Sequence, residues 1–226
     1  MNKLKIIVLI LSFLQMGGLH AEEKKISVGW KSIIIPAING FESNKDFETL
    51  LKNTAHPDLK IFGVFRASGK FDRSRKRYFI ISTSRLNEDA NISINDFSIL
   101  SKDLKASHGD IVNEFYSQTN IKRVNSALSK STGIKTELSF NDTTSLGVFL
   151  ENDTALGIIS VAKVSGRFGT NKVAKTSVPM LLKGKIIVIN IHSEFDSMSD
   201  IEWLKNKSKT WSDKIIKANK ESLFGF

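Results

Sequence analysis

The chain has 226 residues, no cysteine and a formal net charge of +10. Without cysteine it cannot be stapled by disulfides, bind a metal through thiolates or carry the lipid anchor of a bacterial lipoprotein. The excess of lysine and arginine favours an acidic partner, such as anionic lipid, a cell-wall polymer or an acidic protein. The alternative is that the chain is simply rich in lysine and that its charge has no function.

The first 21 residues have the pattern of a secretory signal peptide. Lys3 and Lys5 form a short basic region, an apolar run covers residues 6–14, and a small-residue cleavage site ends at Ala21. The apolar run is shorter than the roughly 20 residues that span a bilayer. We therefore expect cleavage, a single domain over residues 22–226, and no transmembrane segment in it. Export without cysteine favours the periplasm of a Gram-negative bacterium and argues against nucleic acid as a partner.

The first half of the exported chain contains strand and helix signals in turn. A strand predicted over 26–35 ends at Pro36, because proline cannot donate to a sheet ladder. His108-Gly109 predicts a helix break, after which Asp110 begins another helix of about 20 residues. The other predicted elements here are a helix over 43–53, strands over 59–67 and 77–85 that pair as a hairpin with a basic tip, and a helix over 93–106.

The second half predicts strands followed by one long helix. The expected strands cover residues 134–140, 146–150, 156–164, 177–182 and 185–195, with a flexible polar connection over 166–175. In the last strand Ile187, Ile189 and Ile191 fall on one face, because side chains alternate with period two. The following helix, 200–219, has a capping box from Ser199 to Glu202 and an apolar stripe that buries Trp211.

Strands and helices are segregated along this chain rather than strictly alternating. No internal repeat or low-complexity linker divides it. These features predict an α+β fold, a single-domain sandwich in which helices cover a mainly antiparallel sheet.

The sequence offers little for catalysis. After residue 21 only His56, His108 and His192 remain, and no two of them are at metal-ligand spacing. His192 and Glu194 share a strand face and could act as acid and base, or they form a half-exposed polar strand end. There is no Gly-x-Ser-x-Gly or phosphate-loop motif. We therefore expect no metal, no cofactor and no catalytic residue.

Two segments could meet a partner. Residues 70–77 are strongly basic at the tip of the predicted hairpin, and the chain ends on two phenylalanines. The alternatives are a solvated loop that discourages edge pairing and a tail that docks back on the domain. The predicted partner-binding residues are Lys70, Arg73, Arg75, Lys76, Arg77, Phe224 and Phe226.

Several short motifs together resemble a known group. They are Ile35-Pro36 before Gly40-Phe41, Asp96-Phe97, Lys183-Gly184-Lys185, and Asp200, Trp203, Trp211 and Ala218-Asn219. In this order they are similar to small exported bacterial proteins whose general shape is the Mog1/PsbP-like α/β/α sandwich. The resemblance implies an antiparallel sheet between helices and proteins that mainly bind or help assemble other proteins. It implies no catalytic motif for this chain.

Two functional hypotheses follow. The first is an exported, non-catalytic binding protein, such as an immunity protein, inhibitor or assembly factor, that meets an acidic envelope protein or an anionic surface. The second is an envelope enzyme or small-ligand-binding protein whose site is assembled from distant residues. A deep pocket with converging polar groups would favour the second hypothesis.

Overall fold

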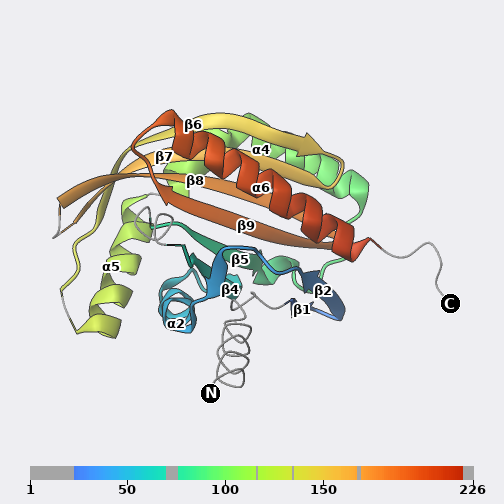
Figure 1. Cartoon of the computed structure of the whole chain (residues 1–226), viewed down its shortest axis with the longest axis horizontal. Helices are drawn as coiled ribbons and strands as arrows, with labels where there is room; N and C mark the ends of the chain where they lie inside the picture. The colour runs from blue at the N-terminus through green and yellow to red at the C-terminus, as the bar shows by residue number, and fades with distance from the viewer. Residues whose placement is uncertain (1–22, 70–75, 116, 134, 167–168, 221–226) are drawn as a thin grey trace, which may run out of the picture.

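A computed structural model describes residues 23–69, 76–115, 117–133, 135–166 and 169–220. These residues form a seven-stranded sheet with the order β3-β4-β5-β9-β8-β7-β6 (Figure 1). Every neighbouring pair in it is antiparallel. The strands are β3 (Phe41–Ser43), β4 (Leu59–Ala67), β5 (Tyr78–Ser84), β6 (Ser139–Asn152), β7 (Ala155–Gly166), β8 (Gly169–Leu182) and β9 (Lys185–Glu194).

Helices lie on both faces of this sheet. The long helix α6 (Met198–Asn219) crosses β8 and β9 on one face, whereas α4 (Ile94–Phe115) lies behind β6 and β7 on the other (Figure 1). On that second side α2 (Lys45–Thr54) packs on β4 and contacts α5 (Gln118–Thr132). The predicted α+β class, with a mainly antiparallel sheet covered by helices, is confirmed. No helix in the described ranges is long and apolar enough to cross a membrane.

The single first strand predicted over residues 26–35 is wrong. Residues 26–35 do not form one strand but belong to a separate hairpin, β1 (Lys24–Val28) and β2 (Lys31–Ile35). The chain reverses at Gly29, whose φ of +54° suits glycine because that region crowds a Cβ. The hairpin packs beside α6, where Asn219 bonds both the N–H and the C=O of Ile34, at 2.8 and 2.7 Å.

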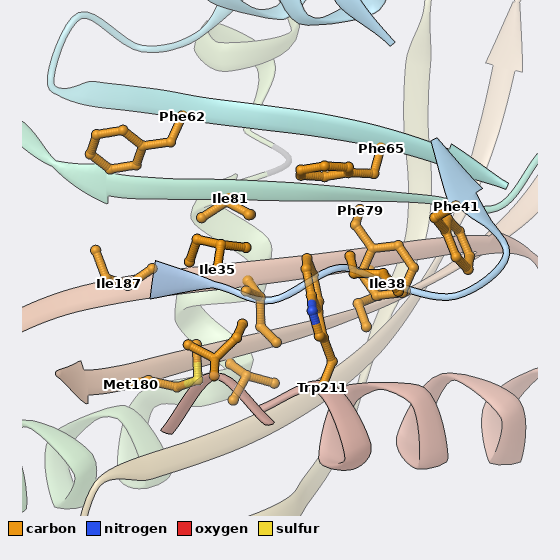
Figure 2. Packing of buried hydrophobic residues seen from close by; sticks show 14 of the residues in the cluster. Ile35, Ile38, Phe41, Phe62, Phe65, Phe79, Ile81, Met180, Ile187 and Trp211 are labelled. Carbon is orange, nitrogen blue, oxygen red and sulfur yellow. The ribbon is translucent and has the colours of Figure 1, made fainter. Parts of the chain in front are cut away.

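The face that α6 covers is closely packed. Ile187, Ile189 and Ile191 of β9 are fully buried there, as their alternation predicts. Trp211 projects from α6 toward Phe79 and is 2% exposed (Figure 2). Its ring meets that of Phe79 edge-to-face, with the centroids 4.5 Å apart. The predicted burial of Trp211 and the interior position of β9 are both confirmed.

A buried ion pair fixes the start of α6. The helix begins at Met198, and its first turn is organised by Asp200 rather than by the predicted pair of Ser199 and Glu202. Asp200 Oδ2 accepts from the backbone N–H of Ser197 at 3.2 Å, while Oδ1 accepts from the Arg77 guanidinium at 3.1 Å. The Asp200 carboxylate thus bonds both the helix end and Arg77, the residue just before β5.

Three other boundaries differ from the sequence expectations. Helix α4 continues through Gly109, since one interior glycine costs only about 1 kcal/mol. The strands expected over 134–140 and 146–150 are replaced by the single long strand β6. The flexible connection expected over 166–175 belongs largely to β8, whose residues from Gly169 onward pair with β7. In β6 and in β8, the hydrogen bonds between neighbouring strands outweigh the preference of a polar sequence for a loop.

Candidate functional site

The face of the sheet opposite α6 carries polar side chains in register. Lys175 of β8 lies directly opposite both His192 of β9 and Ser160 of β7. One row away, Asn190 lies opposite Ser177. Directly opposed residues of an antiparallel pair point to the same side, so strands distant in sequence bring these groups together.

Helix α4 covers this face without filling the space beneath it. A cavity of about 340 Å³ remains between the helix and strands β5, β7, β8 and β9. This volume falls within the range of small-molecule sites, roughly 300–1,000 Å³. The cavity is lined by Leu59, Ser82, Ser84, Asn87, Leu100, Leu104, His108, Ile158, Ser160, Lys175, Ser177, Pro179, Ile186, Val188 and Asn190.

Ser82 is the least satisfied polar group in the cavity wall. Its side chain is 1% exposed, and its hydroxyl has no hydrogen-bond partner among the described residues. A buried hydroxyl without a partner costs free energy, so such groups are uncommon in folded proteins. The neighbouring polar pair is satisfied, because Ser177 Oγ donates to Asn190 Oδ1 at 2.9 Å.

Burial changes the acid–base behaviour of the central row. It lowers the pKa of Lys175 to about 8. Burial, and then the positive charge of Lys175, holds the pKa of His192 well below its usual value. The His192 ring also stacks on Tyr78, with centroids 4.4 Å apart and planes at 10°. His192 is therefore neutral at physiological pH.

His108 faces the cavity from α4. Its Nδ1 lies 2.8 Å from the carbonyl oxygen of Lys105. A carbonyl can only accept, so Nδ1 carries the proton and Nε2 of the neutral ring is an acceptor.

The pairing considered for His192 and Glu194 is not found. The Glu194 carboxylate accepts from Lys76 Nζ. No hydrogen bond joins His192 to Glu194 in the part of the chain that the structure describes. His192 instead stacks on Tyr78 and lies opposite Lys175.

Most of the predicted partner-binding residues lie outside the described ranges. Lys70, Arg73, Arg75, Phe224 and Phe226 are in this group. Of the other two, Lys76 has a side chain that is 63% exposed and paired with Glu194. Arg77 is only 4% exposed, with its guanidinium 3.9 Å from the ring centroid of Trp203. Arg77 thus points into the α6 face and is not presented at the surface.

The cavity was not predicted from the sequence. Lys175 fell in a segment read as a flexible connection, and Ser82 in a strand noted only for its pairing. The available signal was the polar alternation at Ser82 and Ser84 and again at Lys175 and Ser177. Among the described residues no group of three or more His, Asp or Glu side chains could hold a metal ion.

Comparison with known proteins finds distant structural likeness. No protein-family model matches the chain, and no curated protein sequence matches it. The solved structures that match include the Saccharomyces cerevisiae Ran-binding protein Mog1p, at 11% identity over 87% of this chain and 92% of that one, with a TM-score of 0.31. A point mutant of Mog1 matches at 10% identity, 87% and 92% coverage and a TM-score of 0.33. LpqN, involved in cell envelope biogenesis of Mycobacterium tuberculosis, matches at 10% identity over 90% and 94%, with a TM-score of 0.28.

Mog1 gives its name to the general shape of the exported proteins that the sequence motifs resemble, and it is among these structural neighbours. Identities near one tenth and TM-scores of 0.28 to 0.33 describe a remote likeness. They carry no information on what this chain binds or where it works. The cavity is the feature of this chain that bears on its function.

Proposed function

We propose that the chain is an exported, non-catalytic protein that binds a small amphipathic molecule in the cavity between α4 and the sheet. The observation that carries this proposal is the buried hydroxyl of Ser82, which belongs to the cavity wall and lacks a partner among the described residues. A ligand atom there would supply the missing hydrogen bond. The surrounding side chains from α4 and β9 are mainly apolar, so they suit the hydrocarbon part of the same ligand.

The polar groups in the cavity fit binding better than catalysis. Ser177 donates its proton to Asn190, an amide that cannot act as a base. The hydroxyl is therefore not activated as a nucleophile, which requires an adjacent base such as histidine. Both side chains are instead held in fixed positions, as specificity-determining contacts in ligand sites usually are.

Helix α4 offers a matched pair of variants for the test. Leu100 lines the cavity, whereas its neighbour Ile99 is 60% exposed. A bulky indole at position 100 would fill the space, but the same indole at position 99 would extend into solvent. The readout is a fluorescence titration of the purified protein with N-phenyl-1-naphthylamine, a neutral probe that brightens in apolar sites.

We expect saturable binding by the unmodified protein, a loss of at least about tenfold in affinity for Leu100→Trp, and a change within about twofold for Ile99→Trp. Circular dichroism confirms that both variants are folded. Equal affinities for the two variants, or no saturable binding by the unmodified protein, would overturn the proposal.

The export part of the proposal has its own support in the basic and apolar pattern of residues 1–21. It is tested by fractionating producing cells and sequencing the N-terminus of the recovered protein. A mature chain that begins at Glu22 in the periplasmic fraction is the expected result. A protein that retains Met1 in the cytosolic fraction would contradict export.

A second candidate function is contact with an acidic partner through the basic segment. The observation in its favour is the exposure of Lys76, at the boundary of residues 70–75. Reversing Arg73, Arg75 and Lys76 to glutamate should slow association with such a partner, because surface charge mainly steers the approach. Arg77 is left out of this set because its burial gives it a role in the fold. Unchanged association rates would exclude the segment as the contact.

A further inference from the structure

We infer that one end of the sheet docks on an anionic lipid bilayer, and that Trp30, Leu86 and Ile94 enter the lipid interface there. This surface lies outside the cavity, so its role does not depend on the ligand proposed above. Three observations support the inference: the exposure of these side chains, the contacts that gather and fix them, and the charge of the chain.

Three large apolar side chains are exposed at this end. Trp30 is 65% exposed, Leu86 77% and Ile94 52%. Trp30 is at the tip of the hairpin of β1 and β2, Leu86 is in the short 3₁₀ turn that follows β5, and Ile94 is the first residue of α4. A single exposed apolar residue is ordinary, but several gathered in one region mark an interaction site.

Close contacts join the hairpin tip to the loop after β5 and to the start of β9. Gly29 packs so tightly on this loop that a Cβ there would lie 2.6 Å from the Glu88 carbonyl oxygen. Lys185, the first residue of β9, donates to the carbonyl oxygen of Ala90 at 2.6 Å. The same ammonium group lies 3.7 Å from the centroid of the Trp30 ring. The tip is therefore held against the loop that carries Leu86.

The same loop leads to Ile94 and borders the cavity. The N–H of Ile92 bonds the carbonyl oxygen of Gly184, in the turn between β8 and β9, at 2.9 Å, and α4 begins two residues later. Asn87, the neighbour of Leu86, lines the cavity. A bilayer at this end would thus lie beside the cavity and could exchange amphipathic molecules with it.

Trp30 is held in place before any partner arrives. Lys185 is fully buried, and its cation–π contact fixes the indole while leaving most of it in solvent. A side chain that is already ordered loses little conformational entropy on binding, which favours association. Tryptophan also suits the interface of a bilayer, because its ring is apolar and its N–H can still bond water or a head group.

The charge of the chain favours a bilayer that contains anionic lipid. The net charge is +10, and a basic protein is attracted to the negative surface of such a bilayer. Two of the acidic side chains at this end are engaged within the fold. Glu88 is paired with Lys60, and Asp96 accepts from the N–H of Ser93 at the start of α4, while Asp89 is exposed.

Vesicles of different charge test the inference. The purified protein is mixed with vesicles of phosphatidylcholine alone or of phosphatidylcholine with phosphatidylglycerol, and the bound fraction is measured by sedimentation. We expect saturable binding to the anionic vesicles, at least about tenfold tighter than to the neutral ones, and weaker binding as salt is raised. Tryptophan emission should shift to shorter wavelength on binding, because Trp30 leaves water.

Three alanine variants locate the contact. Trp30→Ala should weaken binding to the anionic vesicles at least about tenfold and abolish the emission shift, and Leu86→Ala should weaken binding about threefold. Met198→Ala is the control, because Met198 is 62% exposed but lies at the start of α6, beyond the opposite end of β9. Its binding should stay within about twofold of the unmodified protein. Thermal unfolding checks the fold of each variant, and Leu86→Ala decides alone if Trp30→Ala is unfolded.

The outcomes separate this inference from the proposed function. No binding to anionic vesicles would overturn the inference and would favour a protein partner for this surface. Binding that Leu86→Ala and a folded Trp30→Ala leave unchanged would also overturn it, since another part of the chain would then make the contact. The cavity variant Leu100→Trp should leave vesicle binding unchanged, so a failure of the cavity proposal would show in the probe titration alone.

Discussion

The two faces of the same sheet differ sharply in how they are filled. On β9, Ile187, Ile189 and Ile191 are fully buried under α6, whereas Val188 and Asn190 are half-buried toward α4. The backbone is common to both sets, so the difference arises only from side chains and from the helix above them. The α6 face is packed like the core of a stable domain, and the α4 face retains a cavity.

A cation on each of the two faces shows the same contrast. Arg77, on the α6 face, bonds Asp200, lies over Trp203 and lies 3.3 Å from Ser193 Oγ. Lys175, on the α4 face, is in surroundings that lower its pKa. Arg77 is held in place by the fold, and burial disfavours the charged form of Lys175. We interpret Arg77 as a structural residue.

The largest expected effect is on the α6 face. Arg77→Met should destabilise the protein by about 3–5 kcal/mol, because it leaves the buried Asp200 carboxylate without its cation. Lys76→Met, one residue away, removes only an exposed pair with Glu194 and should cost at most about 1 kcal/mol. Urea unfolding monitored by tryptophan fluorescence measures both values. Similar losses for the two variants would refute the structural interpretation of Arg77.

Neighbouring residues of β9 compare the two faces directly. Ile189→Ala removes a fully buried side chain from the packed face and should cost about 2–5 kcal/mol. Val188→Ala enlarges a space that already exists and should cost about 1 kcal/mol or less. The same urea titrations apply. If Val188→Ala were as costly as Ile189→Ala, the α4 face would be filled in solution and the cavity would not persist.

The same contrast explains what the sequence could predict. The period-two isoleucines of β9 and the stripe that includes Trp211 are strong patterns, and they predicted the packed face correctly. The α4 face depends on which strands become neighbours, because Ser82, Ser177 and Asn190 meet only through the β5-β9-β8 order. A local pattern does not contain that order. The polar start of β8 was misread for the same reason, since its pairing with β7 is a long-range contact.

The third expected effect is a gain in stability at the cavity. Lys175 has a pKa of about 8 in the fold against an ordinary 10.5, so the unfolded chain binds the extra proton between these values. Folding stability from this residue therefore rises as pH increases from about 8 to 10.5, and the penalty is fully present below pH 8. Converted directly into free energy of unfolding, the lowered pKa of Lys175 is worth at most about 3 kcal/mol. Because Lys175 is partly accessible to solvent, we expect a change of about 1–2 kcal/mol.

Lys175→Met should accordingly be more stable than the unmodified protein at pH 7, and the gain should disappear by about pH 10.5. His192 and His108 are the other titratable groups near Lys175, and the lowered pKa of His192 keeps it neutral throughout this range. Urea unfolding from pH 7 to 10.5 measures the difference. Lys172→Met is the control, because Lys172 lies on the same strand and is exposed. A gain that does not depend on pH would show that the effect comes from packing rather than from charge.

The smallest expected effect distinguishes a ligand group from a structural one. Ser82→Ala removes a buried hydroxyl that has no partner among the described residues, so stability should rise by about 0.5–1 kcal/mol. Ser84→Ala, on the same strand and the same cavity wall, is half-buried and should leave stability within about 0.5 kcal/mol. If Ser82 bonds a ligand in the cavity, its alanine variant should gain stability and bind N-phenyl-1-naphthylamine several times more weakly, as roughly one lost hydrogen bond predicts. A loss of stability instead would show that the hydroxyl supports the fold, and would remove Ser82 from the proposed site.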